Sequence, residues 1–149
     1  MHIILDSFPL GAISHPNPAG EAADITKWAL RCVAAGHAIY IPEVIDYELR
    51  RELIRAGKVR GISKLNSLQT VFHYLPLTTD TMLHAAQFWA QSRIGGYSTG
   101  DPKKLDIDAI LAAQAMTLGV VTSDLVIATS NVSHLSRFAP ASEWQNIKP

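Results

Sequence analysis

Residues 105–118 read LDIDAILAAQAMTL, and the predicted organisation of the chain starts from this segment. Asp106 and Asp108 stand where a helical pattern begins, in the N-cap and first-turn positions. The free N–H groups and the positive end of a helix dipole stabilise ionised carboxylates at such positions. The two acids are therefore either ordinary helix caps or candidate metal ligands. The apolar residues that recur at helical spacing behind them are Ile107, Ile110, Leu111 and Leu118.

The composition, 48% apolar and 17% charged, is typical of a soluble globular protein. We expect a single domain over residues 1–149. Thirteen basic residues balance thirteen acidic ones, so the net charge provides no general attraction to nucleic acid. The single cysteine, Cys32, excludes a disulfide framework and a thiolate zinc site, and we expect it in the core. The absence of a long apolar run and of a signal sequence predicts a cytoplasmic protein without membrane contact.

Short apolar runs alternate with longer helical patterns along the chain. The predicted strands cover residues 2–5, 38–41, 74–77 and 125–129. The predicted helices cover residues 19–35, 42–57, 79–94 and 105–118, with a weaker pattern at 65–74. Polar loops are expected at residues 7–18 and 95–104, and Thr79 and Asp80 are expected to cap their helix. This alternation predicts an α/β fold with a mainly parallel sheet covered on both faces.

Polar side chains follow the first and last strong strands. Asp6 comes directly after residues 2–5, and Asn131 follows the strand at residues 125–129. Glu48 lies at the border of the apolar stripe of its helix, so it is either a surface acid or a ligand directed into a shared cleft. All of them can converge at one end of a parallel sheet. Clustered carboxylates are kept together chiefly by a divalent cation, and ligation by oxygen alone favours Mg²⁺ or Mn²⁺.

Four segments in this order resemble the PIN-domain ribonucleases, of which the VapC-type toxins of type II toxin–antitoxin pairs are the largest group. The segments are IILDSFPLGAISHP, IPEVIDYELRREL, DIDAILAAQA and VIATSNVSHLSRF. The resemblance implies a PIN-like three-layer α/β/α sandwich. Asp6, Glu48 and Asp108 match the three main acids of the family, and Asn131 matches a fourth position that is often Asp. Asparagine removes one negative charge there and weakens the case for a second cation.

By the same resemblance, the chain is a Mg²⁺- or Mn²⁺-dependent endoribonuclease. Asp6 and Asp108 would hold the cation, Glu48 would orient or deprotonate the attacking water, and Asp106 would add a direct or outer contact. Ser7 and Thr129, beside these acids, could contact the phosphate or simply pack as hydroxyls. No histidine is required, and the role expected for His134 is to cap or pack the last turn.

The one basic cluster of the chain includes Arg50, Arg51, Arg55 and Lys58, and continues through Arg60 and Lys64. It is a solvated face, a phosphate track for RNA, or a contact for an acidic partner. The resemblance further implies a homodimer and a cognate antitoxin. Two other hypotheses remain. An aspartate-nucleophile phosphatase would need a second acid at the position of Phe8. A catalytically weak or inactive PIN module would bind RNA or a protein partner without cutting.

Overall fold

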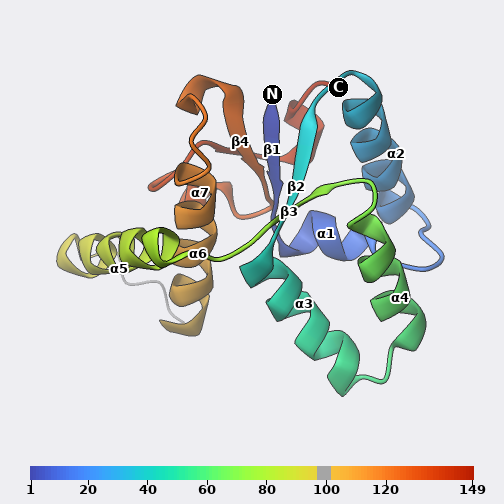
Figure 1. Cartoon of the computed structure of the whole chain (residues 1–149), viewed down its shortest axis with the longest axis horizontal. Helices are drawn as coiled ribbons and strands as arrows, with labels where there is room; N and C mark the ends of the chain where they lie inside the picture. The colour runs from blue at the N-terminus through green and yellow to red at the C-terminus, as the bar shows by residue number, and fades with distance from the viewer. Residues whose placement is uncertain (97–101) are drawn as a thin grey trace.

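A parallel sheet of five strands forms the centre of the molecule (Figure 1). The computed structural model describes residues 1–96 and 102–149, so residues 97–101 of the predicted polar loop lie outside the description. The strands are β1 (His2–Leu5), β2 (Ala38–Pro42), β3 (His73–Leu75), β4 (Leu125–Ala128) and β5 (Ala141–Ser142). Every neighbouring pair is parallel. The predicted α/β class and parallel sheet are confirmed.

The strand order, β3-β2-β1-β4-β5, reverses beside β1. From β1 the chain moves outward to β2 and β3, and it then returns to place β4 on the other side of β1. Leu5 pairs with Ala128 in register, so Asp6 and Thr129 are the first residues beyond the two central strands. In open α/β sheets, ligands bind in the crevice at the carboxyl ends of the strands where the order reverses.

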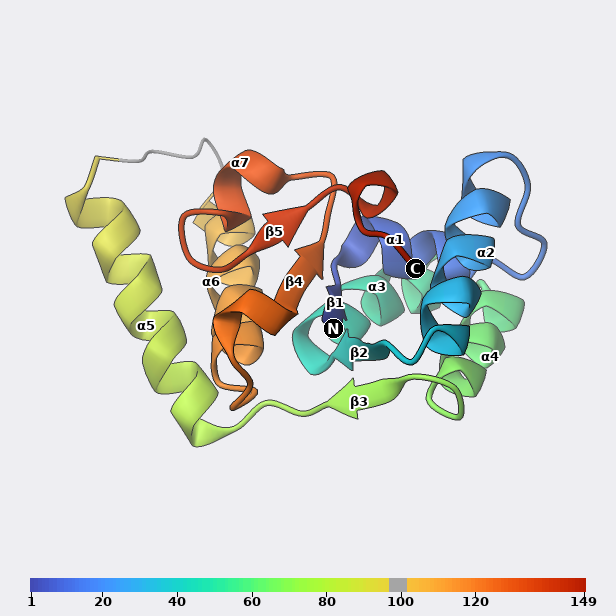
Figure 2. The ribbon, with the colours of Figure 1, turned by 90° about the horizontal axis from the view of Figure 1, so that it is seen from above.

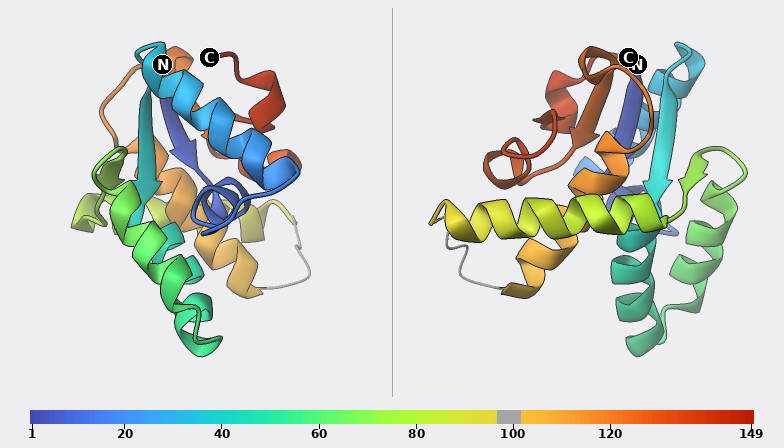
Figure 3. Two further views of the ribbon diagram at one scale, coloured as in Figure 1. Left: turned by 90° about the vertical axis from the view of Figure 1, so that its right-hand side faces the viewer. Right: turned by 60° about the vertical axis from the view of Figure 1, so that its left-hand side comes forward.

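Helices cover both faces of the sheet, as Figure 2 shows. On one side lie α5 (Thr79–Ile94) and α6 (Pro102–Met116), and on the other lie α1 (Ser7–Ile13), α2 (Glu21–Ala34) and α4 (Val59–Leu68). Helix α3 (Glu43–Arg55) extends beyond the end of the sheet beside α4, which both views of Figure 3 show. A short helix, α7 (Val132–Leu135), follows β4. None of the described helices is long and apolar enough to cross a membrane.

The core lies on both sides of β1, where Ile3, Ile4 and Leu5 are all fully buried. Burial on two faces explains why this strand is a continuous apolar run. Cys32 is also fully buried, as expected. Gln114 of α6 is fully buried as well: it accepts from the backbone N–H at the start of α3 (3.3 Å) and donates to the last carbonyl of β3 (2.7 Å). These two bonds fix α6 relative to α3.

The predicted loop at residues 7–18 is wrong in its first half, because Ser7–Ile13 form helix α1. Asp6 is its N-cap, with an Oδ1 that accepts a hydrogen bond from the backbone N–H of Ser7. The proline and glycine of this segment suggested a loop. Pro9, however, lies in the first turn of the helix, where no intrahelical N–H bond is lost.

Three further boundaries differ from the prediction. Helix α4 occupies residues 59–68 rather than 65–74, and β3 occupies residues 73–75 rather than 74–77. Helix α5 is capped by Thr78, whose hydroxyl accepts from the backbone N–H of Thr81 at 3.1 Å, and not by Thr79 and Asp80. Strand β5 was not predicted, because two residues are too few for a sequence pattern.

Candidate active site

A pocket of about 310 Å³ at the carboxyl ends of β1 and β4 collects three of the four predicted acids and Asn131. Asp6 enters it from the end of β1, Glu48 from α3, Asp108 from α6, and Asn131 from the start of α7. We call this cavity the acidic pocket. The other residues that line it are Ser7, Phe8, Lys104, Ile107, Ser130 and His134.

Asp6 is held rigidly at the base of this pocket, where it is 8% exposed. Its Oδ1 accepts from the backbone N–H of Ser7 at 2.6 Å and from the Ser7 hydroxyl at 3.1 Å. Its Oδ2 accepts from the hydroxyl of Thr129 at 2.6 Å. That hydroxyl in turn accepts from the backbone N–H of Asn131 at 2.8 Å. A chain of hydrogen bonds therefore links the ends of the two central strands.

Glu48 is the acid that the fold leaves unsatisfied. Its Oε2 is buried and has no hydrogen-bond partner among the described residues. A buried carboxylate oxygen without a partner is unfavourable unless a ligand supplies the missing interaction. Of the two alternatives for Glu48, a surface acid or an acid directed into a shared cleft, its position in this pocket fits the second.

The helix that carries Asp108 begins earlier than predicted. Helix α6 begins at Pro102, so Asp106 and Asp108 lie beyond its first turn, which contains no acid. The helix dipole therefore does not keep Asp108 ionised. Burial, and then the negative charges of Asp6 and Glu48, raise the pKa of Asp108 to about 6, against a lowering effect of Lys104.

Two polar groups face the Oδ2 atom of Asp108. The side-chain amide of Asn131 donates to it at 3.5 Å, and Nδ1 of His134 lies 3.7 Å away. Asn131 thus donates a hydrogen bond to Asp108. An aspartate at position 131 would instead place a second negative charge beside this carboxylate. His134 is a site residue that sequence reasoning assigned to packing, although it lies within the segment VIATSNVSHLSRF.

Lys104 was missed by sequence reasoning altogether. It lies four residues before Asp108 on α6, a spacing that places two side chains on the same helix face. That spacing was the available signal, but it is visible only once the helix is known to begin before Leu105. Lys104 brings a positive charge into a pocket whose other charged lining residues are carboxylates and, when protonated, His134.

The donor set of the acidic pocket fits a hard divalent cation. Three carboxylates share one small cavity, one of their oxygens has no partner, and the charge of two of them raises the pKa of the third. Within residues 1–96 and 102–149, no group of three His, Cys, Asp or Glu side chains is already arranged to hold a metal ion. Mg²⁺ does not need such a group, because it is commonly held by one or two carboxylates and several waters.

Several predicted residues are not brought to this pocket. Asp106 is exposed and lines a separate apolar hollow between α5 and α6. Thr129 is 2% exposed and supports Asp6 through its hydroxyl, so it offers no surface to RNA in this structure. Ser7 does line the acidic pocket.

The predicted basic cluster begins on α3, with Arg50, Arg51 and Arg55, and lies outside the acidic pocket. Arg50 donates to both carboxylate oxygens of Asp46, at 2.6 and 3.0 Å, and to the side chain of Asn66 at 2.8 Å. Arg55 donates to its neighbour Glu52 at 2.8 Å. These two arginines are therefore engaged in contacts within the protein.

Of the remaining members, Arg51, Lys58 and Arg60 are exposed, and Lys64 is half-buried. The guanidinium carbon of Arg51 lies 5.2 Å from the centre of the Tyr47 ring. Lys58 follows the end of α3 and lines a different cavity, at the end of α1. The basic cluster is thus divided between three environments.

Comparison with solved structures shows a likeness in fold over nearly the whole chain. VapBC2 from Rickettsia felis bound to a DNA fragment from their promoter gives a TM-score of 0.72 at 15% identity, over 97% of this chain and 99% of the other. VapBC-1 from nontypeable Haemophilus influenzae gives 0.65 at 16% identity, over 98% and 100%. DNA-bound VapBC from Salmonella typhimurium gives 0.57 at 16% identity, over 97% and 98%. Among curated proteins, no significant match is found.

Sequence comparison with protein families identifies the PIN domain, matched over residues 19–132. The match includes Glu48, Asp108 and Asn131, while Asp6 precedes it and is placed by the structure. The resemblance to this family seen in the sequence is confirmed. Because the match extends over more than half of its 149 residues, the chain belongs to the PIN domain family.

Proposed function

We propose that this protein is a metal-dependent endoribonuclease and the toxin of a toxin–antitoxin pair. The observation that carries the proposal is the meeting of Asp6, Glu48 and Asp108 in one pocket, with Oε2 of Glu48 buried and unpartnered. Membership in the PIN domain family supports a nuclease. The likeness to VapBC chains supports the toxin role.

Six residues of the acidic pocket would act in the proposed phosphodiester hydrolysis. Asp6 and Asp108 would hold Mg²⁺ or Mn²⁺, which supplies Lewis-acid polarisation of the phosphate and an acidified water. Glu48 would orient the attacking water and accept its proton at Oε2 as the new P–O bond forms. The ester P–O bond would break, and the leaving oxygen would take a proton from solvent water. Lys104 would face the negative charge of the phosphate, and Asn131 and His134 would hold Asp108 in place.

The biological setting follows from the structural neighbours and from the family. VapBC structures support a cognate antitoxin as partner of this chain, and we expect a homodimer. A cytoplasmic location and a single PIN domain over residues 1–149 stay predictions of the sequence.

The test is cleavage of a panel of transfer RNA and structured RNA by the purified protein with Mg²⁺ or Mn²⁺, against EDTA. Asp6→Asn is the decisive variant because asparagine is also a good N-cap and retains the hydrogen bond from the Ser7 N–H. Asp24→Asn, at an exposed acid of α2, is the matched control. We expect metal-dependent cleavage that falls at least about 100-fold in Asp6→Asn and is unchanged in Asp24→Asn.

Two results would contradict the nuclease. Cleavage that survives EDTA or the Asp6→Asn substitution would come from another site or a contaminant. RNA binding without cleavage, together with no binding of Mn²⁺ by calorimetry, would establish the alternative of an inactive PIN module.

A further inference from the structure

Two basic side chains near the turn between α3 and α4, Lys58 and Arg60, differ from the three arginines of α3. Arg50, Arg51 and Arg55 are each engaged by a neighbouring side chain. Lys58 and Arg60 are exposed and form no ion pair with any described residue. Unpaired basic side chains are available for an anionic ligand without the loss of an internal contact.

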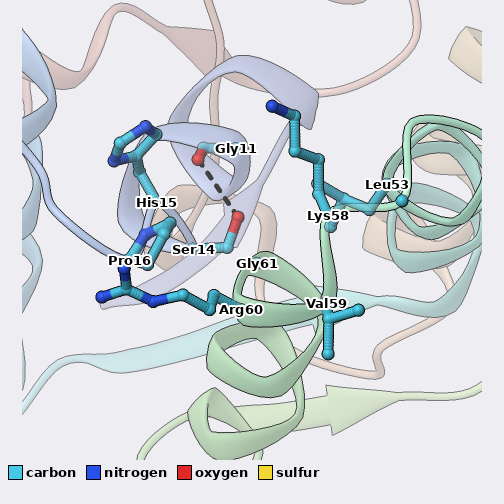
Figure 4. Close-up of a pocket in the computed structure, with 10 residues that line it drawn as sticks. Gly11, Ser14, His15, Pro16, Leu53, Lys58, Val59, Arg60 and Gly61 are labelled. Carbon is cyan, nitrogen blue, oxygen red and sulfur yellow. Dashed lines mark hydrogen bonds between the residues drawn. The ribbon is translucent and has the colours of Figure 1, made fainter.

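Lys58 and Arg60 line a cavity of about 460 Å³ between the end of α1 and the α3–α4 turn. We call this cavity the basic pocket. Figure 4 shows both side chains extending from the turn toward the end of α1, where His15 and Pro16 lie. No acid is among the lining residues, and Leu53 contributes an apolar wall.

Two details add to the positive character of the basic pocket. Nδ1 of His15 lies 3.1 Å from the backbone N–H of Asn17 and accepts from it, which leaves Nε2 of this exposed ring free to donate. The first turn of α4 also lines the pocket, and no side chain caps that helix end. Its free N–H groups and the positive end of the dipole favour a negative group.

The basic pocket lies along the same helices as the acidic pocket. Ser7 and Phe8 at the start of α1 line the acidic pocket, whereas Gly11 and Ser14 at its end line the basic pocket. The seven residues of α1 measure about 10 Å at 1.5 Å per residue. A stacked strand rises about 3.4 Å along its axis for each nucleotide, so this length corresponds to about three stacked nucleotides.

We propose that the basic pocket binds one nucleotide of the RNA strand about three positions from the bond cut in the acidic pocket. Lys58 and Arg60 bind its phosphate, His15 donates from Nε2, and the sugar and base lie against Leu53 and Pro16. The inference rests on the proposed nuclease function. It makes single-stranded RNA long enough to reach both pockets the preferred substrate class, because only an unpaired strand can insert a nucleotide there.

The test measures binding of a fluorescent single-stranded octanucleotide and a dinucleotide in EDTA, at several salt concentrations. The pocket variant is Lys58→Gln with Arg60→Gln. The matched control is Lys27→Gln with Arg31→Gln, which removes the same charge from two residues of α2 that do not line the pocket. We expect the wild type to bind the octanucleotide more tightly than the dinucleotide, and the pocket variant to lose this preference. The salt slope of log Kd should fall by about 0.7 for each lost phosphate contact, and not in the control.

The inference is overturned if the control weakens octanucleotide binding as much as the pocket variant, or if the wild type does not discriminate by length. It is also overturned if the pocket variant keeps RNA affinity but loses affinity for a glutamate-rich peptide, which would assign the basic pocket to a protein segment. Cleavage of the octanucleotide by the wild type with Mn²⁺ is measured in parallel. If the wild type cleaves RNA but the salt slope of log Kd is unchanged in the pocket variant, only the proposed nucleotide subsite is rejected. If the slope falls as expected but the wild type does not cleave RNA, only the proposed nuclease activity is rejected.

Discussion

Helix α3 carries two acids in opposite electrostatic conditions, a buried Asp46 and a half-buried Glu48 whose Oε2 atom is buried. Asp46 is 3% exposed and accepts two hydrogen bonds from Arg50, which also reaches Asn66 of α4. Glu48 turns into the acidic pocket, where its Oε2 has no partner among the described residues. Two positions along a helix correspond to about 200° of rotation, so the two acids face different parts of the molecule. A buried charge that serves only the fold is paired within the fold, and one that is left unpaired is open to a ligand.

Substitutions of Glu48 and Asp46 should differ most in their effect on the rate of RNA cleavage. Glu48→Gln should lower the rate of RNA cleavage at least about 100-fold, because it removes the proton acceptor of the proposed reaction. Thermal stability should be unchanged or higher, since the substituted oxygen has no hydrogen bond to lose and one negative charge leaves the pocket. Cleavage rates and thermal melts of the same preparation measure both properties.

Asp46→Asn is the matched control for that experiment, because it removes the same charge from the same helix. Its cleavage rate per folded molecule should remain at the wild-type level. A loss of cleavage in Asp46→Asn as deep as in Glu48→Gln would show that the two acids act together, and the distinction between them would be wrong.

The second effect is expected in stability, where the substitution of Asp46 should be more damaging than the substitution of Glu48. Asp46→Asn breaks a buried ion pair and should lower the free energy of unfolding by about 2 kcal/mol. This is less than the full penalty for a buried pair, because the partly exposed Arg50 can turn toward water. Urea unfolding measures it. Adding Arg50→Gln to Asp46→Asn should recover part of the loss. A loss below about 0.5 kcal/mol would place the pair among ordinary surface contacts.

A third effect concerns the pH dependence of stability without divalent cations. The pKa of Asp108 is raised from 3.8 to about 6 in the folded protein, so between these values the folded state binds more protons than the unfolded state. Stability contributed by this group therefore falls as the pH rises from about 4 to about 6 and stays low above that range. Asp108→Asn should be more stable than the wild type at pH 8, and its advantage should vanish near pH 4.

Excess Mg²⁺ provides the check on that prediction. At pH 8 it should raise the melting temperature of the wild type and leave that of Asp108→Asn almost unchanged, because ligand binding to the folded state alone stabilises it. Equal shifts in both proteins would mean that the cation binds without Asp108. A wild type that is more stable than Asp108→Asn at pH 8 in EDTA would contradict the raised pKa.

Much of the site could be predicted because its acids follow recognisable strands and helices. Asp6 ends a continuous apolar run, and Asp108 opens an alanine-rich segment that packs on the sheet. The roles of Asp106 and of Arg50 could not be predicted in the same way. Because the helix begins at Pro102 and not at Leu105, Asp106 lies within the helix and not at its N-cap, and it faces the hollow between α5 and α6. The ion pair with Asp46 decides that Arg50 is not available to RNA.

By itself, the sequence determined the fold class, the parallel sheet, and the acids that follow its strands, because buried strands require apolar runs and polar residues stand where those runs end. The tertiary structure alone decided which charges are paired, which carboxylate has a raised pKa, and that Lys104 and His134 join the acidic pocket. It also placed Lys58 and Arg60 in a cavity of their own. These properties depend on distances between residues that are remote in sequence, and electrostatic energies change steeply with distance and burial.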